Sequence, residues 1–309
     1  MAASPQSLAQ PPNPPFKARF KAWWEGTELP VHIPAPVAAA PAAAPDAPPL
    51  PLLDRPATTV APQLWGQGFT QPGGGSFVLD LVKPFALNNS MTVMDFGAGL
   101  GGGTRAVCDQ FDVWVQGLEA SPEMASAAQE LSTRKGAKKA EIKLYRAQDF
   151  QPKAASIDCI FSHASLYRVK EKDKLLGLFE RALKPRGQIS ITDFVRAPGV
   201  AADDPRLRDC AAEPGSAFWL NDDYQKQFKA LKVDVRVDED QSDHYRAAVI
   251  EAWVNFITDA PGMACAKAYP DEAVAEVALW TRRVAALDSG TLQLRRYYGI
   301  KMGSGGKAQ

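Results

Sequence analysis

Residues 92–101 constrain the fold more than any other stretch of the chain. They read Thr-Val-Met-Asp-Phe-Gly-Ala-Gly-Leu-Gly, so an apolar run ends in an acid and is followed by glycines at alternate positions. Short β-branched and apolar runs bounded by glycine are typical of buried strands, which predicts a strand over residues 91–95 and then a tight turn. Gly97, Gly99 and Gly101 lack a Cβ atom, so this turn can adopt positive φ angles and lie against a ligand.

A second acid stands where a nucleotide-binding unit requires one. Residues 113–118 predict the next strand, which ends in Glu119, about 20 residues after Gly99, the spacing at which a carboxylate binds ribose hydroxyls. The order Asp95-x-Gly97-x-Gly99-x-Gly101 departs from the G-x-G-x-x-G of dinucleotide sites. We expect Asp95 to face the ligand, where it suits the cationic amino acid end of S-adenosylmethionine better than a diphosphate. A nicotinamide oxidoreductase and a glycine-rich turn without a ligand remain the alternatives.

The rest of the chain alternates strand and helix patterns. Strands are predicted over residues 91–95, 113–118, 141–145, 157–162, 188–194, 232–237 and 291–300, and helices over 122–134, 171–183, 221–230, 243–258 and 270–288, with one more starting near residue 102. The order predicts an α/β fold, a Rossmann-like doubly wound seven-stranded sheet with a helical insertion before the last strand. A turn is expected at residues 184–187. Trp253, Phe256 and Trp280 indicate core packing, with a cap over a substrate as the alternative.

Ligands of such sheets bind at the carboxyl ends of the strands. We therefore expect His163 and Asp193 to point toward the site. Asp149 and Phe150 follow the third strand, and an acid before an apolar side chain suits an adenine amine and ring, although a solvated turn is equally consistent.

Composition favours one sizeable domain, over residues 63–303. Residues 30–62 are rich in Pro and Ala and predict an extended linker, and residues 304–309 a flexible tail. Lys plus Arg equal Asp plus Glu at 35 each, so no basic field favours nucleic acid. The four cysteines have no C-x-x-C spacing, and no leader or long apolar run appears. These features predict reduced thiols, no metal site and a cytoplasmic location.

The N-terminal segment, residues 1–29, contains a basic and aromatic stretch at residues 16–26. If this stretch is helical, Phe16, Phe20, Trp23 and Trp24 form one stripe flanked by cations. Such a stripe can dock onto a protein surface or lie on an anionic membrane, which would place the protein at the inner membrane surface.

Several stretches together resemble the phosphoethanolamine N-methyltransferases, which are class I S-adenosylmethionine-dependent methyltransferases. They are residues 64–74, the glycine motif at 95–103, Ile-Thr-Asp-Phe at 191–194 and Trp-Thr-Arg-Arg at 280–283, within a similarity that covers about residues 63–300. The resemblance implies methyl transfer to a small-molecule or lipid-precursor acceptor, with an amine as the candidate class. It also implies cofactor contacts at Thr70, Gln71, Gly97, Glu119, Ala120, Asp149, Phe150 and His163, with Gly99 and Gly101 in the same turn.

The family's Tyr–His dyad has no counterpart in this chain. No tyrosine precedes Tyr145, the histidine position falls on Arg168, and Phe194 replaces the tyrosine that follows Thr-Asp. The candidates for a proton acceptor are His163, Tyr167, Asp193 and His244. Arg168 is a candidate for holding an anionic group of the substrate. A catalytically silent module that binds S-adenosylmethionine is the alternative function.

Overall fold

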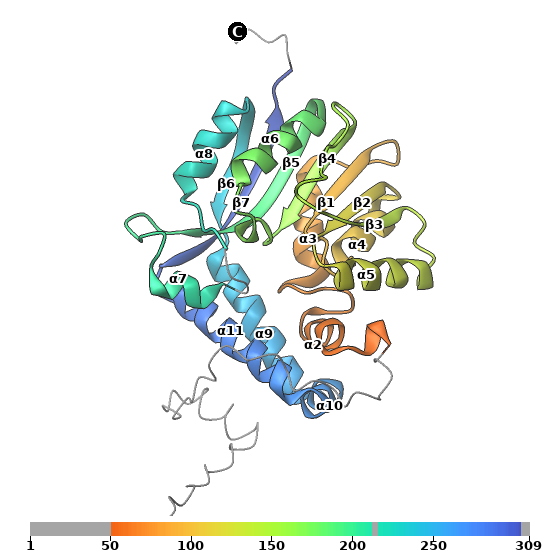
Figure 1. The fold of residues 1–309 in the computed structure, drawn as a ribbon, viewed down its shortest axis with the longest axis vertical. Helices are drawn as coiled ribbons and strands as arrows, with labels where there is room; N and C mark the ends of the chain where they lie inside the picture. Colours follow the sequence, from red (N-terminus) through yellow and green to blue (C-terminus); the bar gives the residue numbers. More distant parts are fainter. Residues whose placement is uncertain (1–50, 212–215, 304–309) are drawn as a thin grey trace, which may run out of the picture. The chain divides into compact units, whose positions relative to one another are not determined.

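Seven strands form one mixed sheet in the order β3-β2-β1-β4-β5-β7-β6 (Figure 1). The strands are β1 (Thr92–Phe96), β2 (Trp114–Glu119), β3 (Ala140–Leu144), β4 (Ile157–His163), β5 (Leu183–Arg196), β6 (Val233–Asp240) and β7 (Leu292–Lys301). The first five pair in parallel, whereas β7 runs antiparallel to both β5 and β6. This arrangement confirms the predicted doubly wound sheet.

The computed structural model describes residues 51–211 and 216–303. The predictions for residues 1–29, for the linker up to residue 50 and for the tail at 304–309 lie outside the described residues. Among those described, no helix combines the length and apolar character that crossing a bilayer requires. All four cysteines are buried and free of disulfides, in agreement with the predicted reduced thiols.

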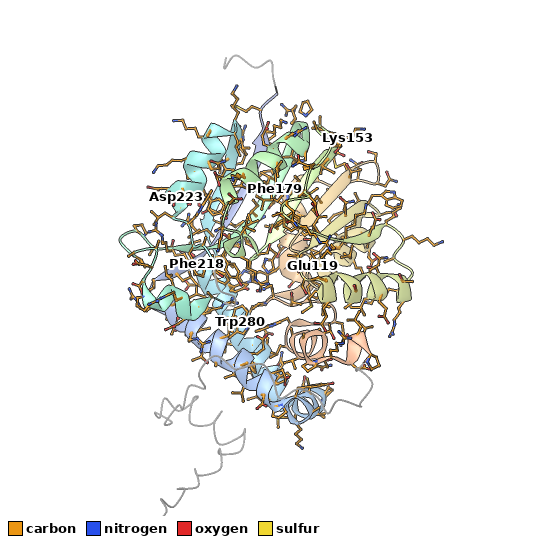
Figure 2. All side chains as sticks on the ribbon, viewed as in Figure 1. Glu119, Lys153, Phe179, Phe218, Asp223 and Trp280 are labelled. Carbon is orange, nitrogen blue, oxygen red and sulfur yellow. The ribbon has the colours of Figure 1, made fainter. Side chains whose placement is uncertain are left out.

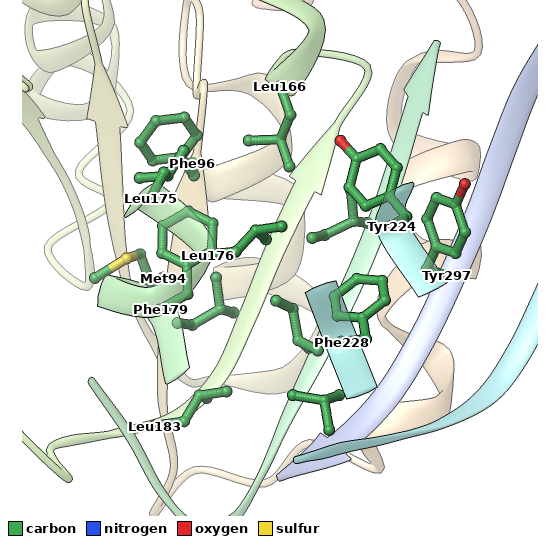
Figure 3. Packing of buried hydrophobic residues seen from close by; sticks show 14 of the residues in the cluster. Met94, Phe96, Leu166, Leu175, Leu176, Phe179, Leu183, Tyr224, Phe228 and Tyr297 are labelled. Carbon is green, nitrogen blue, oxygen red and sulfur yellow. The ribbon is translucent and has the colours of Figure 1, made fainter. Parts of the chain in front are cut away.

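Helices cover both faces of the sheet (Figure 1). One face carries α3 (Gly74–Val82), α4 (Gly102–Phe111) and α5 (Pro122–Arg134), and the other carries α6 (Lys172–Ala182) and α8 (Asn221–Ala230). Successive residues of β1 alternate between these faces, since Val93 packs in the cluster beneath α3 and α4 and Met94 in the cluster beneath α6 and α8. Figure 3 shows the second cluster, in which Phe179 and Phe228 anchor the two helices. Each such buried side chain contributes roughly 1.5–3 kcal/mol.

A helical layer lies beyond the carboxyl ends of the parallel strands. It consists of α2 (Pro56–Trp65), α7 (Pro205–Cys210), α9 (Ser242–Thr258), α10 (Ala260–Ala268) and α11 (Pro270–Asp288). The segment α9–α11 is the predicted insertion between β6 and β7, and Trp253, Phe256 and Trp280 are buried within it, as predicted for core packing. No element was predicted over the residues of α10, in which Pro261 stands in the first helical turn. A proline in the first helical turn removes no helical hydrogen bond.

A helix occupies the last part of the predicted linker. Pro56 begins α2 at the first helical position, and the helix buries Val60, Ala61, Leu64 and Trp65 against the helical layer although Pro62 lies inside it. Tertiary burial outweighs the low helical preference of proline here. The prediction of an extended linker over residues 56–62 is therefore wrong.

The start of β5 also differs from the prediction. The strand begins at Leu183, which pairs with Ile157 of β4, and the next pair is Gln188 with Cys159 of β4. Residues 184–187 therefore form an irregularity within β5, in which Arg186 has a φ of 63°. The turn predicted at residues 184–187 thus interrupts the strand instead of preceding it. Three short 3-10 turns complete the described elements: η1 (Leu52–Asp54), η2 (Lys83–Phe85) and η3 (Leu166–Arg168).

Candidate active site

The glycine turn between β1 and α4 forms the floor of the site. Gly97, Gly99 and Gly101 have φ angles of 81°, 55° and 75°, which residues with a Cβ rarely adopt. A Cβ atom on Gly97 would lie 2.2 Å from the Ser165 hydroxyl, and one on Gly99 would lie 2.6 Å from the Thr70 hydroxyl. Glycine is therefore required at both positions, because φ is positive and because other segments of the same chain pack closely against the turn.

Glu119 fixes this turn to the end of β2. Its Oε2 accepts a hydrogen bond from the Gly99 backbone N–H at 2.8 Å, and its Oε1 accepts one from the Ser121 N–H at 2.8 Å. A carboxylate oxygen can accept a second hydrogen bond, so the half-buried group keeps capacity for ligand hydroxyls. Ala120, the next residue, is exposed. Figure 2 shows Glu119 at the edge where the helical layer faces the sheet.

Asp95 lies beneath the turn. Its carboxylate is 4% exposed and accepts a hydrogen bond from the Thr104 hydroxyl of α4 at 2.7 Å. The pKa of Asp95 is raised to about 7, chiefly by burial; the hydrogen bonding with Thr104 opposes the rise and the nearby Glu119 adds to it. This contact makes Asp95 a brace between strand and helix, and its predicted role in binding the cofactor stays a prediction.

Residues between α2 and α3 cover the turn. The Gly68 carbonyl accepts a hydrogen bond from the Gly102 N–H at 2.8 Å, and Thr70 abuts Gly99. Gln71 accepts a bond from the Tyr245 hydroxyl of α9 at 3.3 Å. The structure therefore places two predicted cofactor residues, Thr70 and Gln71, directly above the floor of the site.

His163 ends β4 and joins this cover to the sheet. Its Nε2 lies 3.2 Å from the Pro72 carbonyl, which can only accept, so Nε2 carries a proton and Nδ1 accepts from the Thr192 hydroxyl at 2.8 Å. Burial lowers the pKa of His163 to about 4, so the ring is neutral at physiological pH. With both nitrogens engaged, His163 shapes the site but is not free to act as the predicted base. His244, the weaker candidate, is exposed and stacks on Phe77.

The loop after β3 forms the side of the site. Asp149 is exposed. The ring centroids of Phe150 and Tyr145 are 5.3 Å apart, and those of Tyr145 and Phe96 are 4.9 Å apart. A cavity of about 540 Å³ includes Asp149, Phe150 and Leu118 in its lining. The acid and the apolar ring thus lie together in the lining of one cavity, and their contact with adenine stays a prediction.

Asp193 and Tyr167 are buried in a network behind the site. One Asp193 oxygen accepts from the Tyr167 N–H at 2.7 Å, and the other accepts from the Lys172 ammonium at 3.0 Å and the Tyr224 hydroxyl at 2.7 Å. Both charged side chains of the Lys172–Asp193 pair are completely inaccessible to solvent. Asp193 is therefore a structural anchor, which corrects its prediction as a catalytic base.

Tyr167 is equally enclosed. Its ring stacks on Phe218 at 5.5 Å, and its hydroxyl accepts bonds from Arg283 at 2.7 Å and Arg168 at 3.1 Å. Since the side chain is fully buried, a substrate does not reach this hydroxyl. The predicted base role of Tyr167 is corrected in the same way, and Arg168 contacts Tyr167 at the edge of the site.

A second cavity, of about 640 Å³, lies between α2, the first turn of α5 and α11. Its lining combines residues of α2 and α5 with Glu272, Glu276 and Arg282 of α11. Sequence reasoning missed Glu276. The only signal available was its position four residues before Trp280, whose indole N–H donates to Glu276 Oε2 at 2.9 Å. The site thus has a glycine floor, a cover from residues 66–74 and an acid-lined cavity under α11.

Comparisons with known proteins agree with this geometry. A family model described as a methyltransferase domain matches residues 87–245, just over half of the chain. The chain belongs to this methyltransferase family. The matched region holds the glycine turn, Glu119, the Asp149 loop and His163.

Individual relatives resemble the methyltransferase over shorter stretches. Phosphoethanolamine N-methyltransferase 2 of Caenorhabditis elegans is 30% identical over 141 residues, which are 45% of this chain and 32% of the relative. The enzyme of Triticum aestivum is 30% identical over 143 residues, 46% of this chain and 28% of the relative. The chain thus spans about a third of the length of these curated relatives.

A solved structure supports the fold. Phosphoethanolamine N-methyltransferase 2 of Haemonchus contortus, in complex with phosphomonomethylethanolamine and S-adenosylhomocysteine, superposes with a TM-score of 0.73 at 20% identity, covering 81% of this chain and 60% of that one. At this identity the likeness establishes the class I methyltransferase fold.

Proposed function

We propose that this methyltransferase transfers a methyl group from S-adenosylmethionine to a small-molecule amine. The observation that carries the proposal is the glycine turn held by Glu119, because Gly99 donates to the carboxylate that stands at the ribose position of nucleotide-binding units. When bound, S-adenosylmethionine supplies a methyl group on an electrophilic sulfonium.

The residues around the turn fit this cofactor. The three glycines with positive φ leave the backbone open to close approach, and Glu119 retains acceptor capacity for two hydroxyls. Asp149 and Phe150 suit an adenine amine and ring. The proposed cofactor contacts are Thr70, Gln71, Gly97, Gly99, Gly101, Glu119, Ala120, Asp149, Phe150 and His163.

The proposed acceptor class follows from the relatives, whose names specify phosphoethanolamine as a substrate. Arg168 and Phe194 occupy the family's dyad histidine and later tyrosine positions, so the acceptor of this chain is proposed only as a small amine. The neutral ring of His163 next to the turn adds no positive charge there, which favours a cationic cofactor.

Calorimetry with S-adenosylhomocysteine and with NADH tests the cofactor. We expect submillimolar binding of the first and none of the second; the reverse result would contradict the proposal. Transfer of a labelled methyl group to phosphoethanolamine, phosphomonomethylethanolamine and ethanolamine tests turnover. Tight cofactor binding without any product would favour the catalytically silent module instead.

We also propose that residues 16–26, which lie outside the described residues, mediate a peripheral contact. Support comes from the basic and aromatic composition of this stretch. Cosedimentation of the full chain with anionic vesicles, compared with a Trp23→Ser/Trp24→Ser variant, tests a membrane contact. Equal sedimentation would leave docking on a protein surface as the remaining role.

A further inference from the structure

Methylation of an amine requires a group that removes a proton, because a protonated nitrogen has no free electron pair. Three of the four candidates from the sequence are engaged elsewhere: His163 uses both ring nitrogens, Asp193 binds three donors, and Tyr167 is fully buried. The fourth, His244, is exposed and stacks on Phe77. The proton acceptor therefore has to come from another part of the site. This inference rests on the proposed function.

The cavity of about 640 Å³ contains the carboxylates that meet this need. Its volume is in the range of small-molecule sites. Three acids line it, one from α5 and two from α11: Glu123, Glu272 and Glu276. Glu123 pairs with Arg55 across the cavity, with 3.1 Å between Oε1 and Nη1, and Glu272 is exposed in the first turn of α11. Glu276 is half-buried, unlike Glu272, and within residues 51–211 and 216–303 it forms no ion pair, unlike Glu123.

Glu276 has acceptor capacity left over. Its Oε2 accepts from the Trp280 indole at 2.9 Å, and within residues 51–211 and 216–303 no hydrogen bond to its Oε1 is recorded. Burial raises the pKa of Glu276, whereas the Trp280 bond and the charges of Arg283 and Arg168 lower it. A carboxylate in this setting is more basic than an exposed one and remains available for a ligand.

Contacts connect this carboxylate with the cofactor side. The Trp280 ring lies 6.0 Å from that of Tyr245, and the Tyr245 hydroxyl donates to Gln71 above the glycine turn. Arg283 is held by Tyr167 and by the Cys210 carbonyl, and its Cζ lies 4.6 Å from the centroid of the Trp280 ring. The open side of Glu276 faces the cavity.

We propose that Glu276 receives the ammonium group of the acceptor in this cavity and takes one of its protons. The proton moves from the nitrogen to a carboxylate oxygen, the electron pair of the N–H bond stays on the nitrogen, and the neutral carboxyl later returns the proton to solvent. The charges of Arg168 and Arg283 lower the pKa of Glu276, and the other charged groups in the lining of the cavity are Arg55, Glu123, Glu272 and Arg282.

The test measures binding, so that it does not depend on turnover. Wild type, Glu276→Gln, Glu276→Asp and the control Asp271→Asn are titrated with phosphoethanolamine, phosphomonomethylethanolamine and ethanolamine in saturating S-adenosylhomocysteine. Gln keeps an acceptor for the Trp280 indole, and Asp271 is an exposed acid of α11 outside the cavity lining. We expect Glu276→Gln to weaken amine binding about tenfold or more, as loss of a charge-assisted hydrogen bond does, and Asp271→Asn to leave it unchanged.

The pH dependence gives a second readout. Wild type and Glu276→Asp should lose amine affinity as the pH falls and the carboxylate becomes protonated, whereas Glu276→Gln should show no such loss. S-adenosylhomocysteine should bind all four proteins equally. Wild-type affinity in Glu276→Gln, or failure of all three amines to bind a wild type that binds S-adenosylhomocysteine, overturns the role of Glu276 alone. Failure of S-adenosylhomocysteine to bind overturns the proposed function as well.

Discussion

Replacing Asp95 with Asn should remove a pH-dependent loss of stability that is built into the floor of the site. Asp95 is 4% exposed, and its pKa rises from 3.8 to about 7 on folding, chiefly through burial. A group whose folded pKa lies above its unfolded pKa contributes stability that is complete below the unfolded value and is lost as the pH rises through the folded value. The free energy of unfolding should therefore decrease from acid to neutral pH.

The magnitude follows from the pKa shift. Each pH unit in which only the folded state holds the proton is worth about 1.4 kcal/mol. From about pH 5.5 to the folded pKa of about 7, a span of roughly 1.5 units, only the folded state holds the proton, and above this pKa no further stability is lost. Between about pH 5.5 and pH 8 the wild type should therefore lose about 2 kcal/mol relative to Asp95→Asn. The Asn side chain still accepts the bond from Thr104, so the packing beneath the turn is retained.

Urea unfolding followed by tryptophan fluorescence at the two pH values measures this difference. The control is Asp109→Asn, which removes an exposed carboxylate of α4 and should follow wild type at both pH values. If the stability of Asp95→Asn changes with pH in parallel with wild type, Asp95 does not carry the titration and the reasoning from burial is refuted.

Three further predictions concern the buried pair, the glycine turn and the histidine. Lys172→Met should reduce the free energy of unfolding by about 3–5 kcal/mol, because the carboxylate of Asp193 stays buried without a counter-charge. Urea unfolding measures this loss, and the control Lys174→Met, at an exposed position, should keep the wild-type midpoint. Similar midpoints for the two variants would show that the buried pair is dispensable. Gly99→Ala should weaken the binding of S-adenosylhomocysteine by about tenfold or more in calorimetry, since φ is 55° and a Cβ would lie 2.6 Å from the Thr70 hydroxyl. The control Gly177→Ala, where a Cβ meets open space, should bind with wild-type affinity. Equal affinities of the two variants would contradict the proposed fit of the cofactor to the turn. In NMR spectra the His163 ring should keep one neutral tautomer from about pH 5.5 to pH 8, because its pKa is lowered to about 4, and a midpoint near the ordinary value would disprove this assignment.

Local patterns allowed the sheet and the floor of the site to be predicted. Glycines at alternate positions after an apolar run determine the turn, and Glu119 follows the next strand at a spacing that the fold keeps constant. Both features depend on residues close together in the chain or on regular strand order. The structure confirms the order of the strands and the positive φ angles of the three glycines.

Side-chain partners from distant segments could not be predicted. The contacts that neutralise Asp193 come from Lys172 and Tyr224, which lie 21 and 31 residues away in the sequence. Without them, an acid at the end of a strand resembles a catalytic group. In the same way, Pro62 lies in a Pro- and Ala-rich stretch, and only burial of Trp65 against the helical layer reveals a helix there.

The end of α2 links the two halves of the site mechanically. Trp65 packs edge-on against Trp253 and Trp280 of the insertion, and three residues later Gly68 is hydrogen-bonded to the start of α4. The short segment from Trp65 to Gly68 thus connects the α9–α11 insertion with the glycine turn. A displacement of Thr70 from Gly99 is therefore coupled through this segment to the packing of Trp65 against Trp253 and Trp280.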